Sequence, residues 1–122
     1  MLYKVGMLCK HFKGKDLYEK NIYRIERLNV LGKDIDESMI TYTGDGDLKL
    51  SENLVVYSSI FQNNKMFARE YEDISAPMSD EKRALYGQTS RVEPLTEEEI
   101  NIINDPVFIK KKKEYILKKY GK

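Results

Sequence analysis

The chain has 122 residues, which is the size of one ordinary domain and excludes two independent cores joined by a linker. Its formal charge is only +1, so no overall electrostatic field draws the protein to nucleic acid or to an acidic membrane. The single cysteine excludes an intrachain disulfide and a cysteine-based zinc site, while 41% hydrophobic residues provide enough apolar surface for a core.

Charge is unevenly distributed along the chain. Residues 1–105 hold 14 basic and 19 acidic side chains, whereas residues 106–122 hold 7 basic and 1 acidic. An acidic body followed by a basic tail indicates a tail that either packs on the body or binds an anionic partner.

The first ten residues carry a short apolar stretch that Lys4 and Gly6 interrupt, with no small-residue cleavage site after it. No apolar run in the chain approaches the length of about 20 residues that spans a bilayer. The sequence therefore predicts a cytoplasmic protein without a membrane partner.

Short strands are predicted in the first half of the chain. Residues 21–30 and 38–43 mix β-branched and aromatic side chains with polar ones, and the Gly-Asp-Gly-Asp sequence at 44–47 is typical of a turn. This pattern predicts a hairpin or a meander.

The strongest predicted strand covers residues 54–61, LVVYSSIF. Both of its faces are partly apolar, which indicates a central position in a sheet. Asn63 and Asn64 tolerate a positive φ and so favour a tight turn into a pairing strand at residues 65–69.

Helix signals follow Pro77. Ser79 is a suitable cap for a short helix through Leu85, and Gly87 is a suitable stop. Thr96 and Glu99 form the two ends of a capping box, with Leu95 and Ile100 spaced as a hydrophobic staple.

A second cap predicts the last helix. Asp105 precedes Pro106, a residue favoured at the first helical position, and an apolar stripe then continues over residues 107–120 until Gly121. We therefore expect two C-terminal helices, of which the last is basic.

Cys9 and His11 are two residues apart, so both point to the same side if the segment is a strand. A metal site needs further ligands that no spacing in the chain supplies, and a Cys–His nucleophile pair needs a contact that this spacing rarely allows. No G-x-S-x-G motif marks a serine nucleophile. The sequence therefore predicts no catalytic residue, metal site or cofactor, and we expect a protein that is not an enzyme.

Residues 10–15, KHFKGK, place three ammonium groups and an imidazole around one aromatic ring. Gly14 allows backbone N–H groups to approach a phosphate closely, although the alternative is a solvated basic edge strand. The segment lacks the P-loop pattern, so nucleotide hydrolysis is not indicated.

Arg69 and Arg91 carry guanidinium groups that suit a carboxylate or a phosphate. Internal ion pairs are the alternative, because acidic residues lie nearby in the sequence, namely Glu70, Glu72, Asp73 and Glu93.

Lys110–Lys113 form a run that turns through more than one helical turn, so some of these side chains must face the body. A solvated helix whose acidic partner is the protein itself is the favoured interpretation. Binding of nucleic acid or an anionic membrane is the alternative.

Several segments, taken in order, resemble a known family of small bacterial and phage domains. They are Lys10-His11-Phe12-Lys13-Gly14, Tyr23, Leu54-Val55-Val56-Tyr57, Phe67-Ala68-Arg69 and Tyr71-Glu72-Asp73-Ile74. The family is catalogued as a domain of unknown function, number sixteen fifty-three, and the similarity covers about residues 7–93. The chain departs from that pattern at Glu70, where the family has a proline, in a longer loop at 34–53 and in an added helical tail from Leu95.

The resemblance implies a compact β domain, most like a small SH3-type barrel, and no established activity. It marks recurring positions in the first segment, in the strong strand and in its pairing strand. If these cationic and aromatic side chains converge, they form an anion site with a stacking surface, which suits nucleotide recognition. The predicted ligand-binding residues are His11, Phe12, Lys13, Tyr57, Phe67, Arg69 and Arg91.

We therefore expect a single α+β domain. Residues 1–95 form a small, strongly curved antiparallel sheet or SH3-like barrel, and residues 96–122 form a C-terminal helical extension that packs on it.

The leading functional hypothesis is a non-enzymatic binding module for a small anionic ligand of nucleotide type. In a phage or prophage setting, such a protein could sequester a host signalling nucleotide. The alternative is a protein–protein or nucleic-acid adaptor that uses the sheet edge or the basic C-terminal helix, with nucleic acid the less favoured partner. Unpaired strand edges also make a homo-oligomer an expected state.

Overall fold

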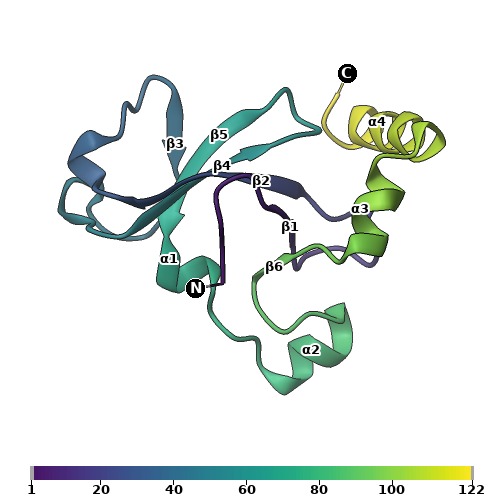
Figure 1. The fold of residues 1–122 in the computed structure, drawn as a ribbon, viewed down its shortest axis with the longest axis horizontal. Helices are drawn as coiled ribbons and strands as arrows, with labels where there is room; N and C mark the ends of the chain where they lie inside the picture. The colour runs from purple at the N-terminus through teal and green to yellow at the C-terminus, as the bar shows by residue number, and fades with distance from the viewer. Residues whose placement is uncertain (1, 122) are drawn as a thin grey trace.

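The computed structural model describes residues 2–121, which fold into one sheet flanked by helices (Figure 1). The strands are β1 (Leu8–His11), β2 (Ile22–Val30), β3 (Ile40–Tyr42), β4 (Leu54–Ser59), β5 (Lys65–Glu70) and β6 (Val92–Pro94). The α-helices are α1 (Tyr71–Ile74), α2 (Asp80–Tyr86), α3 (Glu97–Ile103) and α4 (Pro106–Tyr120), and two short 3-10 helices are η1 (Gly32–Asp34) and η2 (Leu48–Leu50). The fold is therefore α+β, as the sequence predicts.

The six strands pair in the order β3-β5-β4-β2-β1-β6. β4 is internal, as predicted from its two apolar faces, and all six of its residues are buried. β4 and β5 form the predicted antiparallel hairpin, with Tyr57 opposite Phe67 and Val55 opposite Arg69. This hairpin places aromatic and basic side chains next to one another on one face.

The hairpin or meander predicted over residues 21–30 and 38–43 does not form, because these two segments are not neighbours in the sheet. β2 already pairs with β1 on one side and β4 on the other, so β3 crosses to the free edge of β5. β3 runs parallel to β5, with Ile40 opposite Met66 and Tyr42 opposite Ala68. The sheet is consequently mixed and not purely antiparallel.

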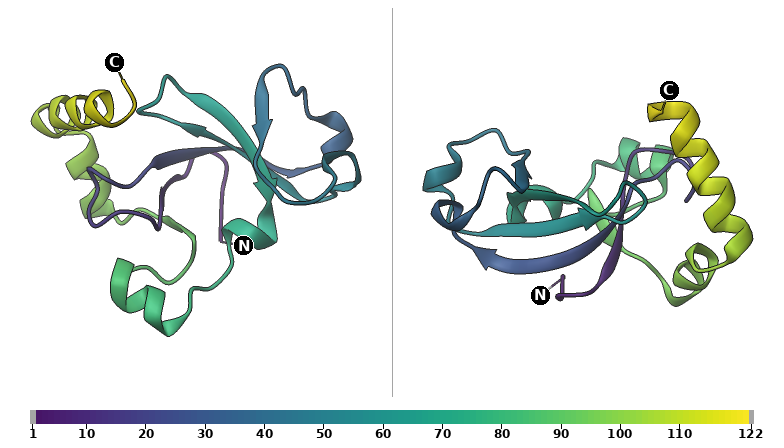
Figure 2. Two further views of the ribbon diagram at one scale, coloured as in Figure 1. Left: turned by 180° about the vertical axis from the view of Figure 1, so that it is seen from behind. Right: turned by 90° about the horizontal axis from the view of Figure 1, so that it is seen from above.

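The sheet is not closed, because β3 and β6 each pair with a single neighbour among the described residues. An SH3-like barrel therefore stays a prediction. Figure 2 shows β3 with the 3-10 helices at one end of the molecule and α4 at the other.

Three hydrophobic clusters fill the interior. The central cluster joins β1, β2, β4 and α1 through residues that include Tyr3, Cys9, Ile25, Val55 and Ile74. A second lies beneath η1 and η2, and a third packs α3 and α4 against Ile22 and the turns beside it. The C-terminal helices therefore share a core with the sheet.

Local signals in the sequence produce the expected turns and caps. Asn63 and Asn64 both adopt a positive φ in the β4–β5 turn. Thr96 and Glu99 form the capping box, and the Ser79 and Asp105 side chains accept backbone N–H groups at the starts of α2 and α4.

Lys112 is the buried member of the Lys110–Lys113 run, with 2% of its surface exposed. Its ammonium donates hydrogen bonds to the backbone carbonyls of Leu17 (2.6 Å), Tyr18 (2.7 Å) and Lys20. The predicted acidic partner is therefore wrong for this lysine: its partners are carbonyl oxygens of the loop between β1 and β2. None of the described helices combines the length and apolar character needed to cross a bilayer.

We predict that Lys112→Met lowers the free energy of unfolding by about 2–4 kcal/mol, because three buried or partly buried carbonyls lose their donor while the side-chain volume is nearly kept. Urea unfolding measures this change. Lys111→Met, at an exposed position one residue away, is the matched control and changes the free energy by less than about 0.5 kcal/mol. Equal effects of the two substitutions would contradict the anchoring role of Lys112.

Candidate functional site

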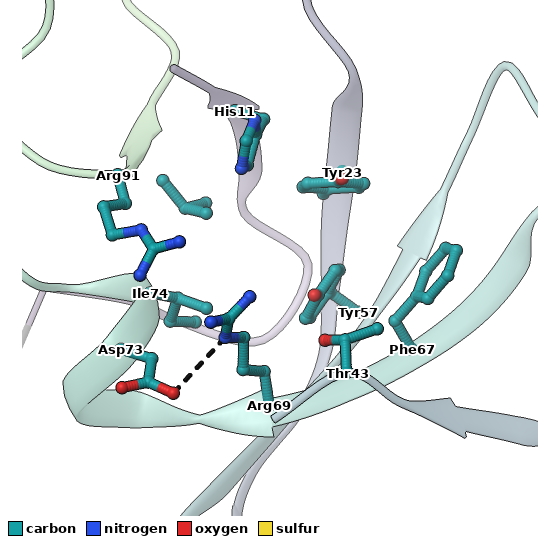
Figure 3. A pocket seen from close by; sticks show the side chains of 10 residues that line it. His11, Tyr23, Thr43, Tyr57, Phe67, Arg69, Asp73, Ile74 and Arg91 are labelled. Atoms are coloured by element: carbon teal, nitrogen blue, oxygen red, sulfur yellow. Dashed lines mark hydrogen bonds and ion pairs between the residues drawn. The ribbon is translucent and has the colours of Figure 1, made fainter. Parts of the chain in front are cut away.

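A cavity of about 140 Å³ opens on the face of the sheet between β1, β5 and α1 (Figure 3). Five of the seven predicted ligand-binding residues line it: His11, Tyr57, Phe67, Arg69 and Arg91. The other lining residues are Tyr23, Thr43, Asp73, Ile74 and Val92. Residues separated by up to 81 positions therefore meet at one place, which we call the arginine cavity.

Two guanidinium groups enter the arginine cavity from different elements. Arg69 extends from β5, and Arg91 extends from the residue before β6. Figure 3 shows both groups pointing into the same space below His11. The backbone fixes Arg91 on both sides, because its N–H donates to the carbonyl of Ala76 (3.1 Å) and its carbonyl accepts from the N–H of Phe12 (2.9 Å).

The positive charge in the cavity is only partly neutralised. Arg69 Nε donates to Asp73 Oδ2 at 3.3 Å, so the predicted internal ion pair forms at this arginine. Within residues 2–121, no carboxylate lies within 4.0 Å of the Arg91 guanidinium. The lining thus contains two arginines against one carboxylate, which leaves the Arg91 charge without a paired carboxylate.

His11 contributes a neutral hydrogen-bond donor. Burial is the largest cause that lowers its pKa to about 4, and the nearby positive charges of Lys13, Arg91, Lys20 and Arg69 contribute to the same shift. Its Nδ1 accepts the backbone N–H of Lys13 at 3.3 Å, so the proton of the neutral ring is on Nε2. The imidazole therefore offers one N–H to a ligand near neutral pH.

Three aromatic rings form one wall of the cavity. Tyr23 and Tyr57 have ring centroids 4.7 Å apart, and Tyr57 and Phe67 are stacked at 5.7 Å. Burial raises the pKa values of both tyrosines, so their hydroxyl groups stay protonated and uncharged. This wall supplies apolar faces and neutral hydroxyls beside the two arginines.

Phe12 and Lys13 lie outside the arginine cavity. Phe12 follows the last residue of β1, and its ring centroid is 4.8 Å from that of His11 and 5.2 Å from that of Tyr86, against which it packs edge-on. The Arg91 guanidinium is 5.9 Å from the same centroid, so Phe12 packs beside two lining residues, His11 and Arg91, without lining the cavity itself. Lys13 is exposed and lines a separate hollow on the other side of His11.

Sequence reasoning missed three polar lining residues. Tyr23 belongs to the family-like pattern, and its place opposite Ser59 in β4 brings it beside Tyr57. Asp73 has a readable signal, the four-residue spacing from Arg69. Thr43 reaches the cavity only because its N–H bonds the carbonyl of Ala68 beyond the parallel β3–β5 pairing, which no local signal indicates.

Cys9 does not join His11 in the cavity. It is fully buried in the central cluster, and burial raises its pKa to about 12, which keeps it an unreactive thiol. Among residues 2–121 no group of three or more His, Cys, Asp or Glu side chains is placed to hold a metal ion.

Comparison of the chain with protein-family models, with curated proteins and with solved structures finds no match. The resemblance to the bacterial and phage family therefore stays a prediction, and the functional argument depends on the geometry of the site.

We predict that His11 makes stability fall in mild acid. Its pKa is about 4 in the folded protein and about 6.5 in the unfolded chain, so between these values the unfolded chain binds more protons. The free energy of unfolding therefore decreases as the pH drops through this window, by up to about 3 kcal/mol from this residue.

Urea unfolding of the wild type and of His11→Asn, at about pH 7 and about pH 4.5, isolates the contribution of the imidazole because the carboxylates are common to both proteins. We expect the wild type to lose about 2 kcal/mol more than the variant. Equal losses would show that the folded protein does not suppress protonation of His11.

Proposed function

We propose that the protein is a binding module whose arginine cavity holds an anionic group of a small nucleotide-type ligand. The observation that carries this proposal is the convergence of Arg69, Arg91 and the His11 N–H donor around one cavity with a single carboxylate. The two N–H groups of a guanidinium match two oxygen atoms of a phosphate, and the neutral imidazole supplies a further hydrogen-bond donor besides the two arginines.

The aromatic wall supports a nucleotide over an inorganic anion. Phe67 is half-buried and lies at the end of the stacked series, with the Lys65 ammonium 5.4 Å from its centroid. A planar base stacks favourably on an aromatic face, and a sugar hydroxyl pairs with the neutral hydroxyls of the tyrosines. The arginines could therefore bind the phosphate while the adjacent aromatic rings contact the base.

Binding, not catalysis, is the role that these side chains favour. The one lining carboxylate, Asp73, is paired with Arg69, so it is a poor general base. The imidazole has its Nδ1 engaged by the Lys13 N–H, and its low pKa makes it a weak proton acceptor. We therefore propose that the protein is not an enzyme.

The proposal includes the setting that the family resemblance suggests. A bacterial or phage protein of this kind, with an SH3-type sheet arrangement and a cytoplasmic location, would sequester a host signalling nucleotide. The same hypothesis includes a homo-oligomer, because the unpaired edges of β3 and β6 could pair with strands of a second copy.

Native mass spectrometry of the protein purified from cells, followed by calorimetry with mono-, di- and cyclic nucleotides, tests this proposal. We expect a small-molecule mass that is lost on denaturation, and heat of binding with at least one nucleotide. An apo mass together with no heat from any nucleotide would refute the proposal.

We predict that Arg91→Gln weakens binding of the nucleotide about tenfold to a hundredfold, because the cavity loses its unneutralised guanidinium. Calorimetry measures the affinity. Arg83→Gln is the matched control, since Arg83 is exposed on α2 and does not line the cavity, and it leaves the affinity unchanged. The same loss in both variants would indicate a nonspecific charge effect.

A second candidate function, a nucleic-acid adaptor, is supported by the surface of α4. Five lysines of this helix are exposed, namely Lys110, Lys111, Lys113, Lys118 and Lys119, and no described carboxylate lies within 4.0 Å of any of their ammonium groups. A row of free ammonium groups on one helix suits a phosphate backbone.

Fluorescence anisotropy with a labelled single-stranded oligonucleotide tests this second candidate. We expect affinity that falls steeply with salt and that is lost when Lys110, Lys111 and Lys113 are changed together to Gln, with folding preserved because Lys112 is kept. Unchanged affinity in the triple variant, or no binding by the wild type, would exclude the helix as a nucleic-acid site.

A further inference from the structure

The arginine cavity is too small for a whole nucleotide. Its volume of about 140 Å³ is below the roughly 300–1,000 Å³ of pockets that enclose a drug-sized molecule. It has room for one phosphate group and its immediate neighbours. The rest of a nucleotide ligand must lie outside it.

A second hollow adjoins the arginine cavity at His11, which lines both. We call it the lysine hollow; its volume is about 180 Å³, and it lies between the loop after β1 and the end of α4. Its lining residues are His11, Lys13, Gly14, Glu19, Asn21, Tyr115, Lys119 and Tyr120. Because His11 lines both, a ligand that extends from the arginine cavity past this side chain would reach the lysine hollow.

The lysine hollow is also basic. No carboxylate among residues 2–121 lies within 4.0 Å of the Lys13 or Lys119 ammonium. The Lys119 ammonium lies 5.8 Å and 5.4 Å from the ring centroids of Tyr115 and Tyr120. Glu19, the one acidic lining residue, already accepts the backbone N–H of Lys15 at 2.9 Å.

The shape of this hollow depends on Gly14. Its φ is +110°, and a Cβ there would lie 2.9 Å from the carbonyl carbon of Glu19. The absence of a side chain lets the turn fold tightly against residues 19 and 20, and Lys13 is then presented on the rim opposite Lys119. Lys13 and Gly14 thus line the lysine hollow and not the arginine cavity, whereas His11 lines both.

We propose that the ligand carries two non-adjacent phosphate groups, one bound by Arg69 and Arg91 and the other by Lys13 and Lys119, with the His11 N–H between them. This inference rests on the proposed nucleotide-binding function and narrows its ligand class. A nucleoside 3′,5′-bisphosphate and a 5′-phosphorylated dinucleotide have this distribution of charge. A 5′-diphosphate, whose two phosphates are adjacent, does not.

Calorimetry with the 3′,5′-bisphosphates and the 5′-monophosphates of adenosine, guanosine, cytidine and uridine tests the inference. We expect the wild type to bind one bisphosphate at least about tenfold more tightly than its 5′-monophosphate, because the second phosphate gains two charge-assisted contacts. Lys13→Ala combined with Lys119→Ala removes this preference and leaves the monophosphate affinity within about twofold. Arg91→Gln weakens both ligands.

The matched control combines Lys111→Ala with Lys118→Ala, which removes two exposed lysines from α4 that line neither hollow. This control keeps the preference for the bisphosphate. Equal affinities of the wild type for a bisphosphate and its monophosphate, or a preference that survives in the Lys13 and Lys119 variant, would overturn the two-phosphate inference alone. Absence of binding by every nucleotide would instead overturn the proposed function, and the inference with it.

Discussion

Two buried ammonium groups, those of Lys112 and Lys20, connect the elements that surround His11 and the arginine cavity. Lys112 binds three carbonyls of the loop between β1 and β2, and Lys20 in that loop donates to the carbonyl of Phe12 and to Gln88 Oε1, both at 2.8 Å. A buried ammonium is costly unless its protons are accepted, so each of these lysines stabilises the fold only while its acceptors stay in place. α4, the loop and the segment before Arg91 are therefore mutually dependent, and the geometry around His11 follows from them.

Much of the fold is predictable from local chemistry. The Asn63-Asn64 turn, the capping box at Thr96 and the Pro106 helix start depend on residues within a few positions of each other, and all appear as expected. The parallel partner of β3 was not predictable, because it depends on which strand edge is left free after β2, β4 and β5 have paired. β6 and α1 have three and four residues, too short for a periodic signal.

The candidate site was predictable to a similar extent. Residue types and the family-like pattern identified both arginines, His11 and two aromatic residues of the arginine cavity. Phe12 was misplaced because its ring packs against Tyr86 of α2, a contact between distant parts of the chain that no signal near Phe12 indicates. The length of the run at residues 110–113 predicts that one of its lysines faces inward. The sequence does not predict that Lys112 binds carbonyls, because every residue has a backbone carbonyl and residue types do not show which ones are free.

Because Asp73 is already paired with Arg69, its carboxylate competes with any anion that would bind Arg69 in the arginine cavity. An incoming anion would have to displace the Asp73 carboxylate from Arg69, whereas it would bind Arg91 without displacing another carboxylate. Monovalent ions such as chloride or acetate carry no more charge than the carboxylate they would displace, and so gain little from the exchange. A doubly charged phosphate gains more from both guanidinium groups. Under the proposed function, Asp73 would therefore favour a doubly charged phosphate over simple monovalent anions at Arg69.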